Sequence, residues 1–143
     1  VISKNNDNFI SKIKKLSKTK KELSVINDQI TAINFSSYIS EATSKMLKKI
    51  ENNPDNENRW GIYHLSGNEP GSWFDFARYA QKMNTLSDPN SSFSQTKILP
   101  ISSREFNQKA KRPNYSFLAS DKLKNNFGIS LPNWKKSISE VIR

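Results

Sequence analysis

The segment 109–116, which reads KAKRPNYS, contains the residues best suited to bind an anion. Lys109, Lys111 and Arg112 come just before Pro113. Because proline restricts the residue before it to extended backbone, Arg112 should present its guanidinium group from a fixed position. A guanidinium group donates two parallel hydrogen bonds to a phosphate. The segment is therefore a candidate phosphate-binding loop, and the alternative is an exposed basic loop that binds nothing.

A second basic stretch, between positions 12 and 21, also offers positive charge to a phosphate. Its lysines are Lys12, Lys14, Lys15, Lys18, Lys20 and Lys21. They are spread around the helix that this stretch is expected to form, instead of gathering on one side. We therefore favour a solvated helix face over a phosphate site.

The other side chains with chemical potential favour structural roles. His64 is the only histidine, and in a chain without cysteine a metal site is disfavoured, as is a Ser–His–Asp arrangement. Trp73, Phe74 and Phe76 could stack on a base or a sugar. Trp73 and Phe76, however, lie at helical spacing beside alanines, which is typical of a core. Phe74 lies off that face and stays undecided.

Motifs for cofactor binding and for catalysis do not occur in the printed sequence. Its four glycines form neither a Gly-x-Gly-x-x-Gly nor a Gly-x-x-Gly-x-x-Gly motif, and there is no Walker loop. No tyrosine is followed four residues later by a lysine. We find no catalytic set within these 143 residues.

Apolar periodicity and turn residues predict the elements that would position these side chains. Helices are expected over 8–20, 35–51, 72–83, 120–128 and from 132 to the end, strands over 22–26, 61–66 and 97–102, and loops over 28–34, 51–58 and 84–96. Pro100 places the strand 97–102 at a sheet edge. The strand 61–66, its turn and a helix capped by Ser72 and Asp75 form a βα unit, which in open α/β sheets holds ligands at the carboxyl ends of strands. The expected fold class is α/β, with several helices and a few short strands.

Composition limits the class of protein. The length of 143 residues suits one domain, yet hydrophobic residues make up only 34%, against roughly 45–50% in globular domains. The chain is thus either a small domain with a large share of solvated surface, or a part of a larger protein whose other part completes its hydrophobic core. The formal net charge of +10 points to an anionic partner: nucleic acid, an acidic membrane or a phosphorylated small molecule. We find no membrane span and no signal peptide, and therefore expect a soluble, cytoplasmic protein.

Six segments, taken in order, resemble the carboxyl-terminal half of dTDP-4-dehydrorhamnose reductase, an extended short-chain dehydrogenase/reductase. They read NFISKIKKL, ELSVINDQI, GIYHLSG with GSWFDFA, ILPISSREF, AKRPNYSFL and FGISLPNW. The match runs from about Asn8 to Val141. Each motif is weak alone, whereas their shared order is specific.

The resemblance implies a two-part enzyme that reduces the 4-keto group of dTDP-4-dehydro-L-rhamnose to give dTDP-L-rhamnose. An amino-terminal Rossmann half would bind NADPH and carry a Tyr-x-x-x-Lys pair, and residues 1–143 would form the single carboxyl-terminal domain that receives the dTDP-sugar. We therefore expect a fragment or a separately expressed domain, not catalytic alone. The apolar stripe of helix 35–51 and the strand 61–66 would pack on the missing half. This stripe consists of Phe35, Tyr38, Ile39, Ala42, Met46 and Ile50. A need for Mg²⁺ and a homodimer stay open.

The resemblance also implies a set of substrate-binding residues. These are Asn8, Phe9, Asp28, Gln29 and Arg112, joined by Lys111 from the basic loop. The chain departs from the family after Asp-Gln, where a Gly-x-Pro-Thr turn is usual and residues 31–34 read TAIN. Because glycine allows backbone angles that threonine resists, this turn should differ.

Two other functions stay open at the level of sequence. The altered turn motivates a non-catalytic, reductase-like regulatory or interaction subunit. The charge of +10 motivates a basic nucleic-acid-binding domain, which the resemblance disfavours.

Overall fold

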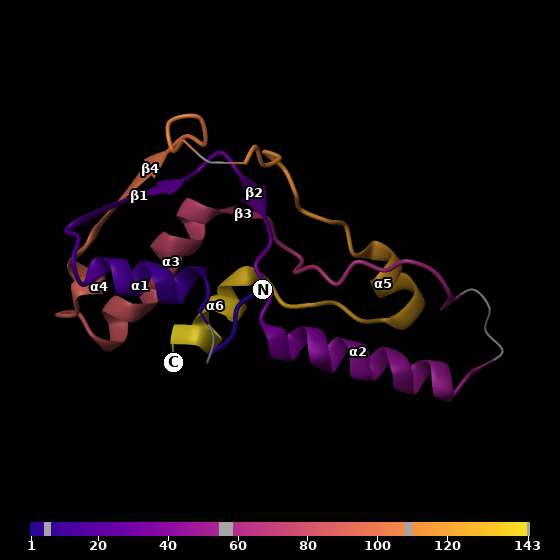
Figure 1. Cartoon of the computed structure of the whole chain (residues 1–143). Helices are drawn as coiled ribbons and strands as arrows, with labels where there is room; N and C mark the ends of the chain where they lie inside the picture. Colours follow the sequence, from indigo (N-terminus) through magenta and orange to yellow (C-terminus); the bar gives the residue numbers. More distant parts are fainter. Residues whose placement is uncertain (5–6, 55–58, 108–109, 143) are drawn as a thin grey trace.

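The computed structural model describes residues 1–4, 7–54, 59–107 and 110–142, so Lys109 lies outside the described residues. Its helices and strands are α1 (Phe9–Ser17), β1 (Glu22–Ile26), β2 (Ile30–Thr31), α2 (Ser36–Glu51), β3 (Gly71–Ser72), α3 (Trp73–Ser87), α4 (Ser92–Gln95), β4 (Lys97–Ile101), α5 (Asp121–Phe127) and α6 (Trp134–Ile142). The predicted α/β class is confirmed. Figure 1 shows α1, α3, α4 and α6 grouped below β1 and β4, with α2 and α5 on the right.

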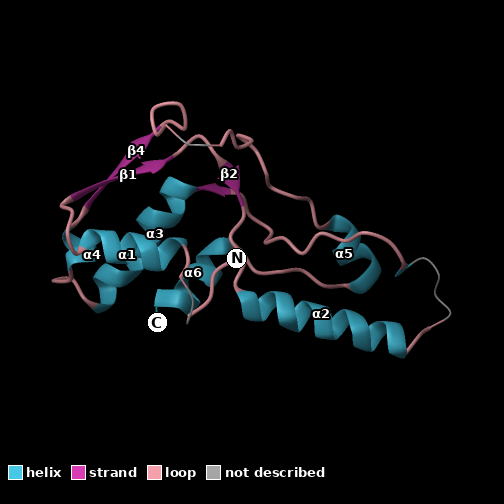
Figure 2. Cartoon of the chain, in the orientation of Figure 1, coloured by secondary structure: helices cyan, strands magenta, loops and turns pink. Residues whose placement is uncertain are grey.

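Two small sheets lie above the helices in the view of Figure 2. β1 and β4 are parallel, with Val25 opposite Pro100, and β2 and β3 are antiparallel, with Ile30 opposite Ser72. Pro100 has no amide hydrogen to donate, and it lies on an edge strand as predicted. Because β1 and β4 run in the same direction, their carboxyl ends meet, and the segments that follow them lie side by side.

The main core lies between the parallel strands and the helices α1, α3 and α6. Phe76 and Ile138 are fully buried there, which confirms the core position predicted for Phe76. Trp73 and Phe74 are half-buried and pack against this core. No helix of the described part of the chain is both long and apolar enough to cross a membrane.

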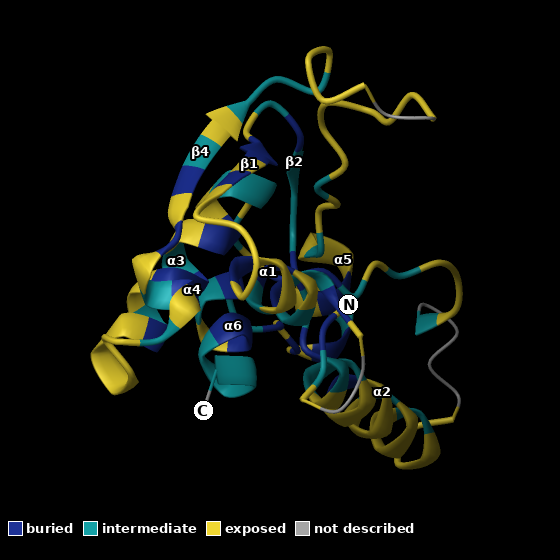
Figure 3. Ribbon diagram, turned by 60° about the vertical axis from the view of Figure 1, so that its left-hand side comes forward, coloured by how far each residue is buried: buried dark blue, intermediate teal, exposed yellow. Residues whose placement is uncertain are grey.

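A smaller core joins α2 to α5 and to the segment 129–131. It contains Ala42, Leu123, Phe127, Ile129 and Leu131. α2 buries only Ala42 fully, and Figure 3 shows most of this helix exposed. Only part of the apolar stripe predicted on helix 35–51 is therefore covered by the described residues.

Helices α1 and α3 begin where side chains satisfy their free amide groups. Asn8 caps α1 in a capping box with Ser11. Ser72 and Asp75 form the capping box predicted for α3. Gly128 ends α5 with left-handed backbone at φ 61°, a conformation that glycine adopts without strain.

The prediction of a strand over 61–66 is wrong. These residues belong to no strand, and the next residue, Gly67, forms a single isolated bridge with Leu131. A β-strand needs a partner to pair with, and no described segment supplies a ladder here. The predicted loops were also too long, since 28–34 contains β2 and 84–96 contains the end of α3 and all of α4.

Candidate functional site

Two neighbouring cavities lie near the carboxyl ends of β1 and β4. The apolar cavity has a volume of about 530 Å³ and lies between α1, β1 and the start of α3. The basic cavity has a volume of about 340 Å³ and lies among the segments that follow β1 and β4. Gln29 and Arg112 line both cavities. The two hollows therefore adjoin each other and can hold two parts of one ligand.

Aromatic rings form the rim of the apolar cavity. Phe9, Trp73 and Phe106 line it together with Ile13 and Val25. The rings of Phe9 and Trp73 pack against each other at 4.8 Å between centroids, with 55° between their planes. A flat ring of a ligand can stack or pack edge-on against such a surface.

The basic cavity is lined by cations and by neutral polar groups. Arg104, Lys111 and Arg112 supply the positive charge, beside Ser103 and Asn114 among others. None of the described residues that line it is an aspartate or a glutamate. Guanidinium and ammonium groups that line a hollow without carboxylates in its lining suit a phosphate or diphosphate.

The segment 28–30 holds both loops of the basic cavity in place. The Ser103 amide donates to Asp28 Oδ1 at 2.9 Å, and the Ser103 hydroxyl donates to Asp28 Oδ2 at 2.9 Å. The Ile30 amide donates to the Asn114 carbonyl at 2.7 Å, and the Ser116 amide donates to the Ile30 carbonyl at 2.9 Å. One short segment thus fixes the loop after β4 and the loop that carries Arg112.

A second carboxylate stabilises the loop after β4. The backbone amide and the hydroxyl of Ser102 donate to Glu105 Oε2 at 3.1 and 2.6 Å. These hydrogen bonds favour the ionised carboxylate and hold the pKa of Glu105 below its ordinary value of 4.5. Phe106, the next residue, reaches the rim of the apolar cavity.

The substrate-binding residues predicted from the sequence fall into two groups: those that line a cavity and those that do not. Phe9, Gln29, Lys111 and Arg112 line the cavities. Asn8 and Asp28 line neither. The Asn8 side chain caps α1, with its oxygen accepting from the amides of residues 10 and 11, and the Asp28 carboxylate accepts from Ser103.

Sequence reasoning missed Arg104 and Phe106. Both follow a predicted strand, at the carboxyl end where α/β folds place ligands, and that position was the signal that could have found them. The lysines of α1 fit the solvated face predicted for them, since most are exposed. Lys12 is the member of that stretch that lines the apolar cavity.

His64 lies away from both cavities. It is exposed, and its Nδ1 lies 3.1 Å from the carbonyl oxygen of Ala119. Within residues 1–4, 7–54, 59–107 and 110–142, no group of three or more His, Cys, Asp or Glu side chains could hold a metal ion.

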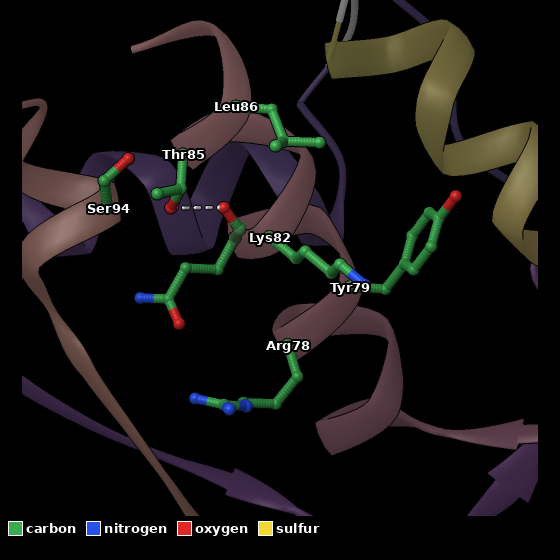
Figure 4. A pocket seen from close by; sticks show the side chains of 7 residues that line it. Arg78, Tyr79, Lys82, Thr85, Leu86 and Ser94 are labelled. Atoms are coloured by element: carbon green, nitrogen blue, oxygen red, sulfur yellow. Dashed lines mark hydrogen bonds between the residues drawn. The ribbon is translucent and has the colours of Figure 1, made fainter. Parts of the chain in front are cut away.

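A further hollow of about 460 Å³ lies beside the second half of α3, against α4. Figure 4 shows that Arg78 and Lys82 leave the helix in different directions, so their charges do not converge on one point. The Thr85 hydroxyl donates to the Gln81 carbonyl at 2.9 Å, the bond drawn in Figure 4. This hollow shares no lining residue with the other two.

In this fold a basic hollow and an apolar, aromatic hollow adjoin each other at the carboxyl ends of the parallel strands. The whole chain, residues 1–143, matches the family model described as the RmlD substrate binding domain. The chain therefore belongs to the RmlD substrate binding domain family, and the resemblance found in the sequence is confirmed.

Individual relatives support the assignment of the chain to this family. The dTDP-4-dehydrorhamnose reductase of Sinorhizobium fredii is 34% identical over 142 residues, which are 99% of this chain and 46% of that protein. The spore coat polysaccharide biosynthesis protein SpsK of Bacillus subtilis is 29% identical over 95% of this chain and 42% of its own length. The chain thus spans less than half the length of these relatives, and it matches their carboxyl-terminal part.

Solved structures show the same fold. A dTDP-4-dehydrorhamnose reductase from Clostridium acetobutylicum matches with a TM-score of 0.80 and 26% identity, over 96% of this chain and 44% of that one. The reductase from Bacillus anthracis, solved in complex with NADP, matches with a TM-score of 0.73 and 28% identity, over 98% and 44%.

Proposed function

We propose that this chain receives the dTDP-sugar in an NADPH-dependent dTDP-4-dehydrorhamnose reductase that makes dTDP-L-rhamnose. The observation that carries the proposal is the pair of joined cavities. The basic cavity, with Lys111 and Arg112, takes the diphosphate. The apolar cavity, with Phe9, Trp73 and Phe106, takes a ring attached to it. Arg112 and Gln29 lie at the junction and contact the region between the two parts.

The chemistry of the reduction divides between two halves of the enzyme. Reducing the 4-keto group requires a hydride at the carbonyl carbon and a proton at its oxygen. NADPH supplies the hydride when it is bound, and we assign its site and the proton donor to a preceding Rossmann half. The residues described above bind the diphosphate, hold the sugar in register and exclude water from one side of it.

The surface of α2 and of the neighbouring segment supports this division. Leu47, Trp60 and Ile62 are large apolar residues that are mostly exposed. Residues 61–66 belong to no strand, and no described segment forms a ladder with them. We propose that the Rossmann half covers this surface, which would also account for the low hydrophobic fraction of 34%.

The test is ligand binding by the chain alone and by the natural polypeptide that carries it. Calorimetry with dTDP and dTDP-rhamnose should give weak binding to the 143 residues and tighter binding to the longer protein. The longer protein should also oxidise NADPH in the presence of the keto-sugar. If dTDP changes neither the heat signal nor the melting temperature of the longer protein, the proposal fails.

A non-catalytic reductase-like subunit is the second candidate, motivated by the altered turn at 31–34. That turn lines neither cavity. Thr31 lies in β2, Ile33 is buried, and Asn34 accepts a hydrogen bond from the Gly67 amide at 2.7 Å. Its sequence therefore gives no reason for lost ligand binding. A longer protein that binds dTDP but leaves NADPH unchanged with the keto-sugar would favour this candidate.

A further inference from the structure

We infer that Arg104 is a third ligand-binding cation of the basic cavity and that Asp28 positions it. The inference rests on the proposed function, because the ligand group in question is the diphosphate of the dTDP-sugar. Arg104 lines the basic cavity with Lys111 and Arg112.

The backbone on both sides of Arg104 is fixed by carboxylates. Ser103, which precedes it, donates its amide and its hydroxyl to Asp28. Glu105, which follows it, accepts from the amide and the hydroxyl of Ser102. The backbone of Arg104 therefore lies in a short loop that hydrogen bonds hold on both sides. Less conformational entropy is lost when its guanidinium group binds a ligand than if the loop were free.

The parallel pair of strands explains why residues far apart in sequence meet at this point. Asp28 follows β1, and Arg104 follows β4. The carboxyl ends of β1 and β4 are neighbours, with Ile26 opposite Ile101. In α/β folds this end of the strands is where ligands bind.

The charges around the basic cavity favour a ligand with more than one negative charge. Arg104, Lys111 and Arg112 repel one another, and among the described residues no ion pair involves any of them. The two nearby carboxylates, of Asp28 and Glu105, do not line the cavity and accept hydrogen bonds from serines instead. The diphosphate of a dTDP-sugar would offset most of the charge of the three cations and accept several charge-assisted hydrogen bonds.

The first experiment measures dTDP and thymidine binding to the natural polypeptide that carries this chain, by calorimetry. Arg104→Gln should weaken dTDP binding by about tenfold or more, since it removes a charge-assisted contact. It should leave the affinity for thymidine, which has no phosphate, unchanged. Arg78→Gln is the matched control, because Arg78 is an exposed arginine that lines neither cavity of the site, and it should bind dTDP like the wild type.

The outcomes separate the two proposals. A wild-type protein that does not bind dTDP overturns the proposed function. A wild type that binds dTDP, with Arg104→Gln binding equally well at an unchanged melting temperature, overturns the role of Arg104 alone. Equal losses for dTDP and thymidine would also overturn it, because they would indicate a general change in the site.

The variant Asp28→Asn tests the role of Asp28, because an effect of its charge and an effect of its positioning would change the dTDP affinity in opposite directions. Removing a negative charge near an anion site should tighten dTDP binding if Asp28 acts only through its charge. If Asp28 positions the loop, Asp28→Asn should weaken dTDP binding. It should then add little to the loss in Arg104→Gln, because both changes act on the same contact. Tighter binding by Asp28→Asn, or losses that add in the double variant, would refute the positioning role.

Discussion

Trp134 of α6 and Phe76 of α3 pack edge to face at the centre of the main core, with 5.1 Å between ring centroids and 63° between planes. The Trp134 indole nitrogen also donates to the Pro70 carbonyl at 3.3 Å. Gly71, the first residue of β3, lies against both rings. This contact joins the last helix of the chain to the start of α3, and it leaves no space for a side chain at Gly71.

Gly71→Ala should destabilise the protein by about 1–3 kcal/mol, which is typical of overpacking in a core. An added Cβ would lie 2.6 Å from Phe76 Cε1 and 3.1 Å from Trp134 Nε1. Both rings are held by their neighbours and cannot move away cheaply. Urea denaturation of wild type and variant measures the change. An unchanged midpoint would show that the rings can adjust.

Ser72→Ala should destabilise α3 by about 1 kcal/mol, the usual effect of losing a helix cap. Ser72 Oγ accepts from the Asp75 amide at 3.0 Å, and Asp75 Oδ2 accepts from the Ser72 amide at 2.9 Å. The control is Ser44→Ala on the exposed face of α2, which should be neutral or slightly stabilising because alanine favours helix. Equal unfolding midpoints for the two variants would contradict the prediction.

The sequence allowed prediction of those elements that depend on local signals. The capping box at Ser72, the periodicity of α1 to α3 and the β-branched strand β1 all act within a few residues. The strand expected at 61–66 failed, because pairing depends on a partner that local sequence does not contain.

The candidate site likewise contains residues that local sequence predicts and contacts that depend on distant segments. Arg112 was predictable from its own neighbours, since Lys111 and Pro113 flank it. The contact between Asp28 and Ser103 joins residues 75 positions apart and depends on the parallel pairing of β1 with β4. Asn8 was predicted as a ligand contact from family resemblance, whereas its side chain caps α1, a role that its position before an apolar run also indicates.

Arg112→Gln should weaken dTDP binding by about tenfold or more, since Arg112 lines both cavities and can form paired hydrogen bonds with a phosphate. Arg112→Lys should recover only part of the affinity, because an ammonium group lacks the fork of the guanidinium. Calorimetry at low and high salt is the measurement, with Lys124→Gln on the exposed face of α5 as control. Wild-type affinity in the lysine variant would show that the positive charge suffices and that the fork is irrelevant.

Acid should loosen the loop after β4 only well below neutral pH. The hydrogen bonds from Ser102 lower the pKa of Glu105 in the folded state. The stability that these hydrogen bonds add to the loop is therefore fully present at pH values above 4.5, the ordinary pKa of a glutamate. It is lost as the pH falls through the lower, folded pKa. The Ser102 amide signal in NMR should therefore titrate below pH 4.5. Glu105→Gln should abolish that step, and a midpoint above 4.5 would contradict the assignment.

The 143-residue chain alone should self-associate, because its apolar surface beside α2 lacks the cover that we assign to the Rossmann half. Trp60 is 67% exposed and Ile62 is 83% exposed. Replacing both by serine should reduce association without lowering the unfolding midpoint, since neither side chain is part of a core. Sedimentation at several concentrations measures the association. In the longer natural polypeptide the same two changes should leave the association state unchanged, because there the Rossmann half covers this surface. A chain that stays monomeric, with a melting temperature independent of concentration, would show that this surface needs no partner.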